Sequence, residues 1–150
     1  MKRPLIVWMK KENGTWTVKK SNIRDYIKKP GVWIMRGMKD SRYIDLEAGE
    51  TSDMALEISE DTGLIFLLAE CKTLPEKTFR PYSKYHLISR YCSEIKIECV
   101  CLNDEREKRS KEEVEVGKDC LFWRPFNKQW KGLPEGWQIS HPEKDWTKQE

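Results

Sequence analysis

Apolar and polar residues alternate in two stretches near the start of the chain. Residues 5–9 and 15–18 are rich in β-branched and aromatic side chains, and Asn13-Gly14 stands between them. Both central residues of a two-residue hairpin turn need positive φ, which Asn and Gly tolerate best. The pattern therefore predicts a β-hairpin. A short helix should follow Ser21-Asn22, whose side chains can cap it, and should end at Pro30-Gly31.

A second hairpin is predicted directly afterwards. Residues 32–35 and 43–46 are apolar stretches of strand length, and polar turn residues separate them. Thr51-Ser52-Asp53 then offers oxygens that can cap a helix, so we expect a helix to begin near Met54. The apolar run 64–68 fits either a buried strand or a helix, and the pattern alone leaves both open.

The second half of the chain predicts two more helices around one strand. Apolar residues at helical spacing indicate a helix over residues 83–92, after a proline-containing loop. Residues 95–102 alternate at first and then become fully apolar, which is typical of a central strand. The charged run 103–110 should lead into a third helix that ends near Gly117 or Lys118.

Together these elements predict an α/β (α+β) fold, in which about three helices flank a small mixed or antiparallel sheet with an extra N-terminal β-hairpin. The 150 residues fit one domain. We expect the first hairpin and short helix in residues 1–29, the core in 30–127 and an irregular tail in 128–150. Trp137 and Trp146 are the side chains that could hold this tail in place.

Charge and cysteine content narrow the class of protein. The chain carries 28 Lys and Arg against 25 Asp and Glu, a net charge of +3, which permits nucleic-acid binding without requiring it. It has neither a long apolar run nor a secretory leader, so we expect a soluble, cytoplasmic protein. Its five cysteines are scattered among apolar residues rather than set in Cys-x-x-Cys pairs, which indicates reduced, buried thiols.

Two separated parts of the chain resemble one known family. Residues 31–35 and 46–53 resemble the hairpin that opens the GIY-YIG nuclease domain, and Glu115 and Asn127 follow near the spacing of that family's metal-binding Glu and late Asn. The resemblance covers residues 30–127. It implies metal-dependent hydrolysis of phosphodiesters in nucleic acid, DNA rather than RNA. The implied cofactor is Mg²⁺ or Mn²⁺, held by Glu115.

The chain departs from that family at three catalytic positions. Trp33 stands where the first Tyr is expected, and an indole has no hydroxyl that can accept a proton. The family's second motif is the YIG part of its name. If Ala48-Gly49 ends this second motif, Glu47 replaces its Tyr, and Glu57 stands where the first helix should supply an Arg. A competing alignment takes Tyr43-Ile44-Asp45 as the second motif, which restores a hydroxyl but not the Arg.

Three hypotheses follow from different classes of protein. The chain could be a divergent endonuclease in which Glu47, Glu57 and Glu115 approach one another, so that two carboxylates bind metal and one activates water. It could be a nuclease-like fold that has lost catalysis and binds nucleic acid. It could also be a module that binds a protein partner. Trp16, Trp123 and Trp130 each stand near Lys or Arg, a pattern that suits base stacking or a small aromatic core.

Overall fold

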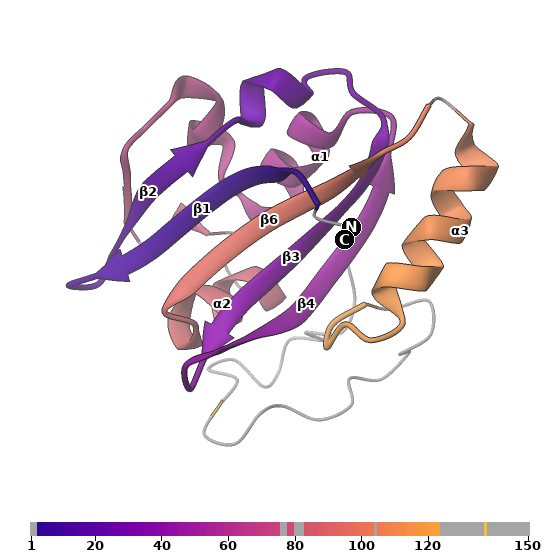
Figure 1. The fold of residues 1–150 in the computed structure, drawn as a ribbon. Coiled ribbons are helices and arrows are strands. Elements are labelled where there is room, and N and C mark those ends of the chain that lie inside the picture. Colours follow the sequence, from indigo (N-terminus) through magenta and orange to yellow (C-terminus); the bar gives the residue numbers. More distant parts are fainter. Residues whose placement is uncertain (1–2, 76–77, 80–82, 104, 124–136, 138–150) are drawn as a thin grey trace.

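The computed structural model describes residues 3–75, 78–79, 83–103, 105–123 and 137. These residues form a six-stranded antiparallel sheet in the order β4-β3-β6-β1-β2-β5 (Figure 1). The strands are β1 (Leu5–Glu12), β2 (Thr15–Ser21), β3 (Gly31–Lys39), β4 (Arg42–Thr51), β5 (Thr73–Pro75) and β6 (Glu94–Cys101). The helices are α1 (Met54–Thr62), α2 (Lys84–Tyr91) and α3 (Arg106–Gly117), with 3-10 turns η1 (Ile23–Tyr26) and η2 (Ile65–Ala69). The predicted α+β class is confirmed.

Both predicted hairpins form, and both belong to the same sheet. Asn13 and Gly14 have φ values of 54° and 74°, as a tight turn between β1 and β2 requires. Asp40 and Ser41 also have positive φ, at 51° and 65°, and join β3 to β4. Since β6 pairs with β3 on one side and with β1 on the other, the N-terminal hairpin extends the sheet that carries the second hairpin.

The two faces of the sheet differ in what covers them. Ile95, Ile97 and Cys99 of β6 point to one face and are fully buried. Helices α1 and α2 lie behind this face in Figure 1 and close the main core over it. The alternate residues of β6 point to the opposite face, where α3 lies beside β4 at one edge.

Local chemistry explains where the helices begin and end. The Asp53 carboxylate accepts a hydrogen bond from Leu56 N at 3.1 Å, so α1 starts where the sequence predicts. Gly63, at φ 82°, ends that helix in the left-handed conformation. Ser83 caps α2 in the same way by accepting from Tyr85 N and His86 N.

Three segments differ from the predictions. The short helix expected between Ser21-Asn22 and Pro30-Gly31 is only the 3-10 turn η1, and its N-cap Asn22 makes no side-chain cap hydrogen bond. The run 64–68 is neither a strand nor an α-helix, because η2 leaves Ile65 and Phe66 exposed while Leu64 and Leu67 enter the core. Residues 73–75 form β5, which the pattern does not predict and which exists through its pairing with β2. All five cysteines are free thiols, as expected, but Cys71 is only half-buried and Cys101 is exposed. In the described part of the chain, helices are too short or too polar to cross a membrane.

Candidate functional site

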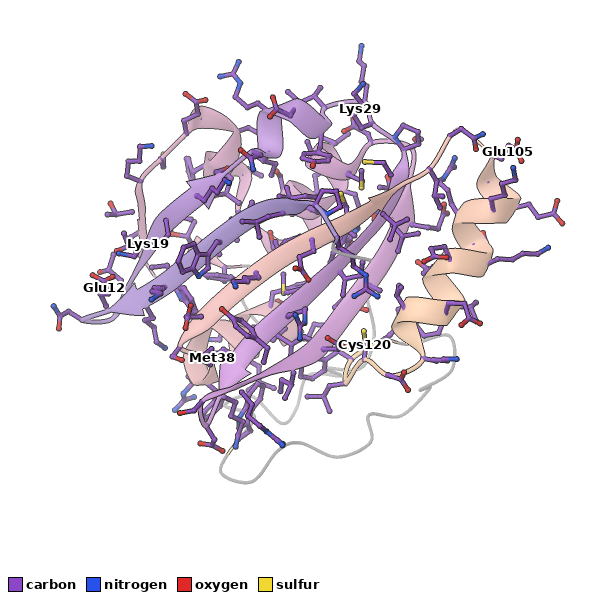
Figure 2. The ribbon with its side chains drawn as sticks, in the orientation of Figure 1. Glu12, Lys19, Lys29, Met38, Glu105 and Cys120 are labelled. Atoms are coloured by element: carbon purple, nitrogen blue, oxygen red, sulfur yellow. The ribbon has the colours of Figure 1, made fainter. Side chains whose placement is uncertain are left out.

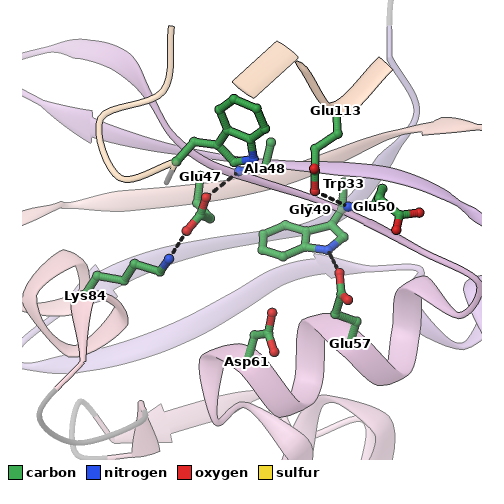
Figure 3. Close-up of a pocket in the computed structure, with 10 residues that line it drawn as sticks. Trp33, Glu47, Ala48, Gly49, Glu50, Glu57, Asp61, Lys84 and Glu113 are labelled. Atoms are coloured by element: carbon green, nitrogen blue, oxygen red, sulfur yellow. Dashed lines mark hydrogen bonds and ion pairs between the residues drawn. The ribbon is translucent and has the colours of Figure 1, made fainter. Parts of the chain in front are cut away.

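An acidic cavity of about 150 Å³ lies beside strand β4 (Figure 3). Its lining residues come from β3 and β4 of the sheet, from α1, α2 and α3, and from Trp123. Its lining comprises Trp33, Glu47, Ala48, Gly49, Glu50, Glu57, Asp61, Lys84, Glu113 and Trp123. Within this lining, five carboxylates meet one ammonium group, so the cavity favours cations over anions.

Trp33 forms the floor of the cavity and is held there by a glycine and a carboxylate. Trp33 lies directly opposite Gly49 in the pairing of β3 with β4. A Cβ atom on Gly49 would come within 2.7 Å of the indole, so only glycine lets the ring lie against the strand. The indole Nε1 donates a 2.6 Å hydrogen bond to Glu57 Oε2 (Figure 3). The indole therefore acts as a donor that orients Glu57.

Glu57 carries a carboxyl group that holds its proton unusually strongly. Burial raises its pKa to about 7, and the negative charges of Asp61, Glu50 and Glu113 act in the same direction. The hydrogen bond from Trp33 opposes this shift without cancelling it. A carboxyl with a pKa near neutrality can both accept and release a proton at neutral pH, which is the property of a general base.

Glu47 and Lys84 form a buried ion pair at one end of the cavity. Glu47 is 2% exposed and Lys84 is 4% exposed, and Lys84 Nζ contacts Glu47 Oε2. The other carboxylate oxygen of Glu47 accepts a hydrogen bond from Ala48 N at 3.0 Å. Burial raises the pKa of Glu47 to about 7 although Lys84 lowers it. The pair ties α2 to β4.

Helix α3 contributes Glu113 to the cavity and protects the edge of the sheet. Glu113 Oε2 accepts a 2.8 Å hydrogen bond from Glu50 N, and Arg109 Nε pairs with Glu50 Oε2 at 3.0 Å. An unpaired backbone N–H at a sheet edge invites a foreign strand, so the Glu113 bond also blocks edge pairing. Burial raises the pKa of Glu113, and the charge of Glu50 adds to the effect.

The structure brings some of the predicted site residues together and separates others. Trp33, Glu47 and Glu57 line the cavity together. Glu115 does not line it, since this side chain is exposed and pairs with Lys118 at 3.4 Å. Residues two positions apart in an α-helix lie about 200° apart around its axis. Glu113 therefore faces the cavity and Glu115 faces away. Asn127 lies outside the described residues.

Tyr43 lies on the opposite face of the sheet from the cavity. It pairs with Met38 near the turn of the second hairpin, and its hydroxyl donates a 3.0 Å hydrogen bond to Glu94 Oε1. Burial and the neighbouring Glu94 carboxylate raise the pKa of Tyr43 to about 12. Of the two proposed alignments, the one that ends at Ala48-Gly49 is the one that places Trp33 beside the second motif.

Sequence reasoning missed Glu50, Asp61 and Glu113 as residues of the site. Helical spacing could have found Asp61, because it follows Glu57 by one turn on α1. The tryptophans proposed for base stacking are buried: Trp16 packs against Phe79 in the core, and Trp123 lines the cavity and packs on Gly117. Trp130 lies outside the described residues.

Comparison with known proteins finds no matching family model, no matching curated protein and no matching solved structure.

Proposed function

We propose that the acidic cavity is the active site of a divergent, GIY-YIG-like nuclease that hydrolyses phosphodiesters of nucleic acid with Mg²⁺ or Mn²⁺. The observation that carries the proposal is the meeting of Trp33, Gly49 and Glu57 with a carboxylate of α3 in one cavity. Trp33 and Gly49 belong to the hairpin that resembles the nuclease family, whereas Glu57 stands where that family has an Arg. Glu113 takes the role that the sequence suggested for Glu115.

The cavity offers donors that suit a hard divalent cation. Glu50 and Glu113 come from different elements and lie close together, so that the charge of Glu50 raises the pKa of Glu113. A bound cation would relieve this repulsion. Within the described residues, three or more His, Cys, Asp or Glu side chains do not converge on one metal position. Mg²⁺ commonly uses only one or two protein carboxylates and keeps several water molecules, so Glu113 and Glu50 are the residues that would hold it.

Residues of the chain itself would carry out the other parts of the reaction. Bound Mg²⁺ or Mn²⁺ would polarise a phosphoryl oxygen and supply the positive charge that the missing Arg provides in the family. Glu57, oriented by the Trp33 N–H, accepts the proton of the attacking water. Lys84 holds Glu47 in the wall of the cavity and keeps that carboxylate paired.

The decisive experiment compares two glutamates on one helix. Labelled single- and double-stranded DNA and RNA are incubated with pure protein in EDTA, Mg²⁺ or Mn²⁺. We expect metal-dependent cleavage by the wild type, a loss of at least about 100-fold in Glu113→Ala and Glu57→Gln, and unchanged cleavage in Glu115→Ala. Glu115→Ala is the matched control because it removes the same charge from the opposite side of α3. Equal losses in Glu113→Ala and Glu115→Ala would refute the assigned site.

A second candidate function is a nuclease-like domain that binds nucleic acid and has lost cleavage. The specific observation in its favour is that the cavity's carboxylates already have protein partners: Glu57 has Trp33, and Glu50 has Arg109. The described lining also holds no Arg to neutralise a phosphate. A wild type that binds nucleic acid and fails to cleave it with either metal would establish this second function in place of the first.

A further inference from the structure

The sheet face opposite α1 and α2 carries a row of cationic and aromatic side chains. Trp8 of β1 is the cross-strand neighbour of Lys96 of β6, which in turn pairs with Arg36 of β3. Lys20 of β2 continues the row on the other side of Trp8. This face is turned toward the viewer in Figure 2, with α3 at its right edge. The row crosses four adjacent strands away from the acidic cavity.

Trp8 and Tyr43 donate hydrogen bonds to the same acceptor on this face. Trp8 Nε1 donates to Glu94 Oε1 at 2.9 Å, and the Tyr43 hydroxyl donates to the same oxygen at 3.0 Å. Since β1 and β4 lie on opposite sides of β6, the shared Glu94 acceptor holds the two rings near each other over the sheet. Lys96 Nζ lies 4.8 Å from the Tyr43 ring centroid and 5.4 Å from that of Trp8. The rings and the ammonium group form one continuous surface.

The acidic groups on this face each have cationic or hydrogen-bonding neighbours. Arg36 pairs with Asp45 at 3.0 Å and with Glu98 at 3.7 Å. Although burial acts in the other direction, the hydrogen bonds from Trp8 and Tyr43 and the positive charges of Lys10 and Lys96 hold the pKa of Glu94 below its usual value.

Three lysines on the same face keep positive charge available. Lys10 lies 5.2 Å from the centroid of Trp8, and Lys20 and Lys96 flank the same ring along the row. Among the described residues none of the three forms an ion pair with a carboxylate. Rings beside these cations match a chain of bases joined by phosphates.

We propose that this face binds single-stranded nucleic acid, with bases stacked on Trp8 and Tyr43 and phosphates held by Lys10, Lys20 and Lys96. The inference deepens the proposed function, on which it rests for the class of partner, by naming the strandedness and the binding surface. Duplexes keep their bases stacked inside the helix and cannot offer base faces to a flat sheet. Single strands can.

The test measures binding without allowing cleavage. Fluorescence anisotropy is recorded in EDTA with labelled oligothymidine and oligouridine of about 12 nucleotides, and with a duplex of the same length. We expect Trp8→Leu and Tyr43→Leu each to weaken single-strand binding about 5- to 100-fold. Trp8→Phe and Tyr43→Phe keep a ring and should retain most of the binding. The duplex should bind at least about 10-fold more weakly than either single strand.

A second pair of variants tests the charges. Lys10→Glu and Lys96→Glu should each weaken binding and reduce its salt dependence, whereas Lys108→Glu, an equal charge change on exposed α3, should not. Circular dichroism of each variant checks that it folds. Single-strand binding that is equal in the wild type, the two Leu variants and the Lys10 and Lys96 variants would overturn the inference.

The two proposals fail separately. Binding in EDTA that depends on Trp8 and Tyr43, without cleavage when metal is added, would overturn the nuclease proposal and support the binding face. Metal-dependent cleavage that is unchanged by both Leu variants would support the active site and overturn the binding face. Absence of any nucleic-acid binding by the folded wild type would overturn both.

Discussion

Two opposing effects act on the single carboxyl group of Glu57. The surrounding protein removes water and adds nearby negative charge, which favours the protonated form, while the Trp33 N–H favours the ionised form. The first effect is larger, so Glu57 holds its proton to a higher pH in the folded chain than in the unfolded chain. Such a carboxyl destabilises the fold at neutral pH and is the kind of group that catalysis retains.

Glu57→Gln should therefore change how stability depends on pH. Between pH 4.5 and about 7 the folded state keeps a proton that the unfolded state releases, so stability falls as pH rises through this window. Gln removes this titration and still accepts the Trp33 hydrogen bond. From pH 5 to pH 8, we expect the stability of Glu57→Gln relative to wild type to rise by on the order of 1–2 kcal/mol, allowing for partial exposure.

Urea denaturation at several pH values measures this difference. Glu60→Gln is the matched control, because Glu60 lies on the same helix with its side chain exposed. An identical pH dependence for Glu57→Gln and wild type would show that Glu57 does not titrate in this window.

At the scale of elements, α1 fixes the position of Glu57 and Asp61 in the cavity. The helix starts at a defined residue because Asp53 caps it, and the two acidic side chains then follow on one face. A helix that began one residue later would turn that face by about 100° and remove both carboxylates from the cavity. The cap is thus a determinant of the site as well as of stability.

Asp53→Ala should cost about 1 kcal/mol of unfolding free energy, since Leu56 N loses its acceptor. Ser52→Ala is the control: Ser52 is the exposed neighbour and the cap bond to Leu56 N comes from Asp53, so we expect a change below about 0.5 kcal/mol. Chemical denaturation measures both. A Ser52→Ala loss as large as that of Asp53→Ala would place the cap on the wrong residue.

At the scale of the whole molecule, local signals predict the fold better than the site. Alternation, turn residues and caps are encoded within each hairpin and helix, so the strands and helices were predictable, whereas β5 depends on pairing with a distant strand. The hairpin that resembles the nuclease family points to Trp33, and the position expected for that family's first-helix Arg points to Glu57. Glu113 was missed because Glu112, Glu113 and Glu115 are all acidic on a weakly amphipathic helix, and only packing against β4 decides which one faces inward.

Packing between distant segments also explains why Trp137 is buried. From the sequence, Trp137 was only one of two side chains that could hold the tail in place. Its ring stacks on Tyr91 with centroids 5.1 Å apart and lies 6.4 Å from Phe122, and it is 6% exposed.

Trp137→Ala should therefore lower the unfolding free energy by about 3 kcal/mol, through lost burial and the cavity left behind. Trp137→Phe should recover part of the loss because a smaller ring can still stack on Tyr91. Ile65→Ala is the control, since Ile65 is 54% exposed and its truncation should change stability far less. Equal stabilities of Trp137→Ala and Ile65→Ala in urea would mean that Trp137 does not belong to the core in solution.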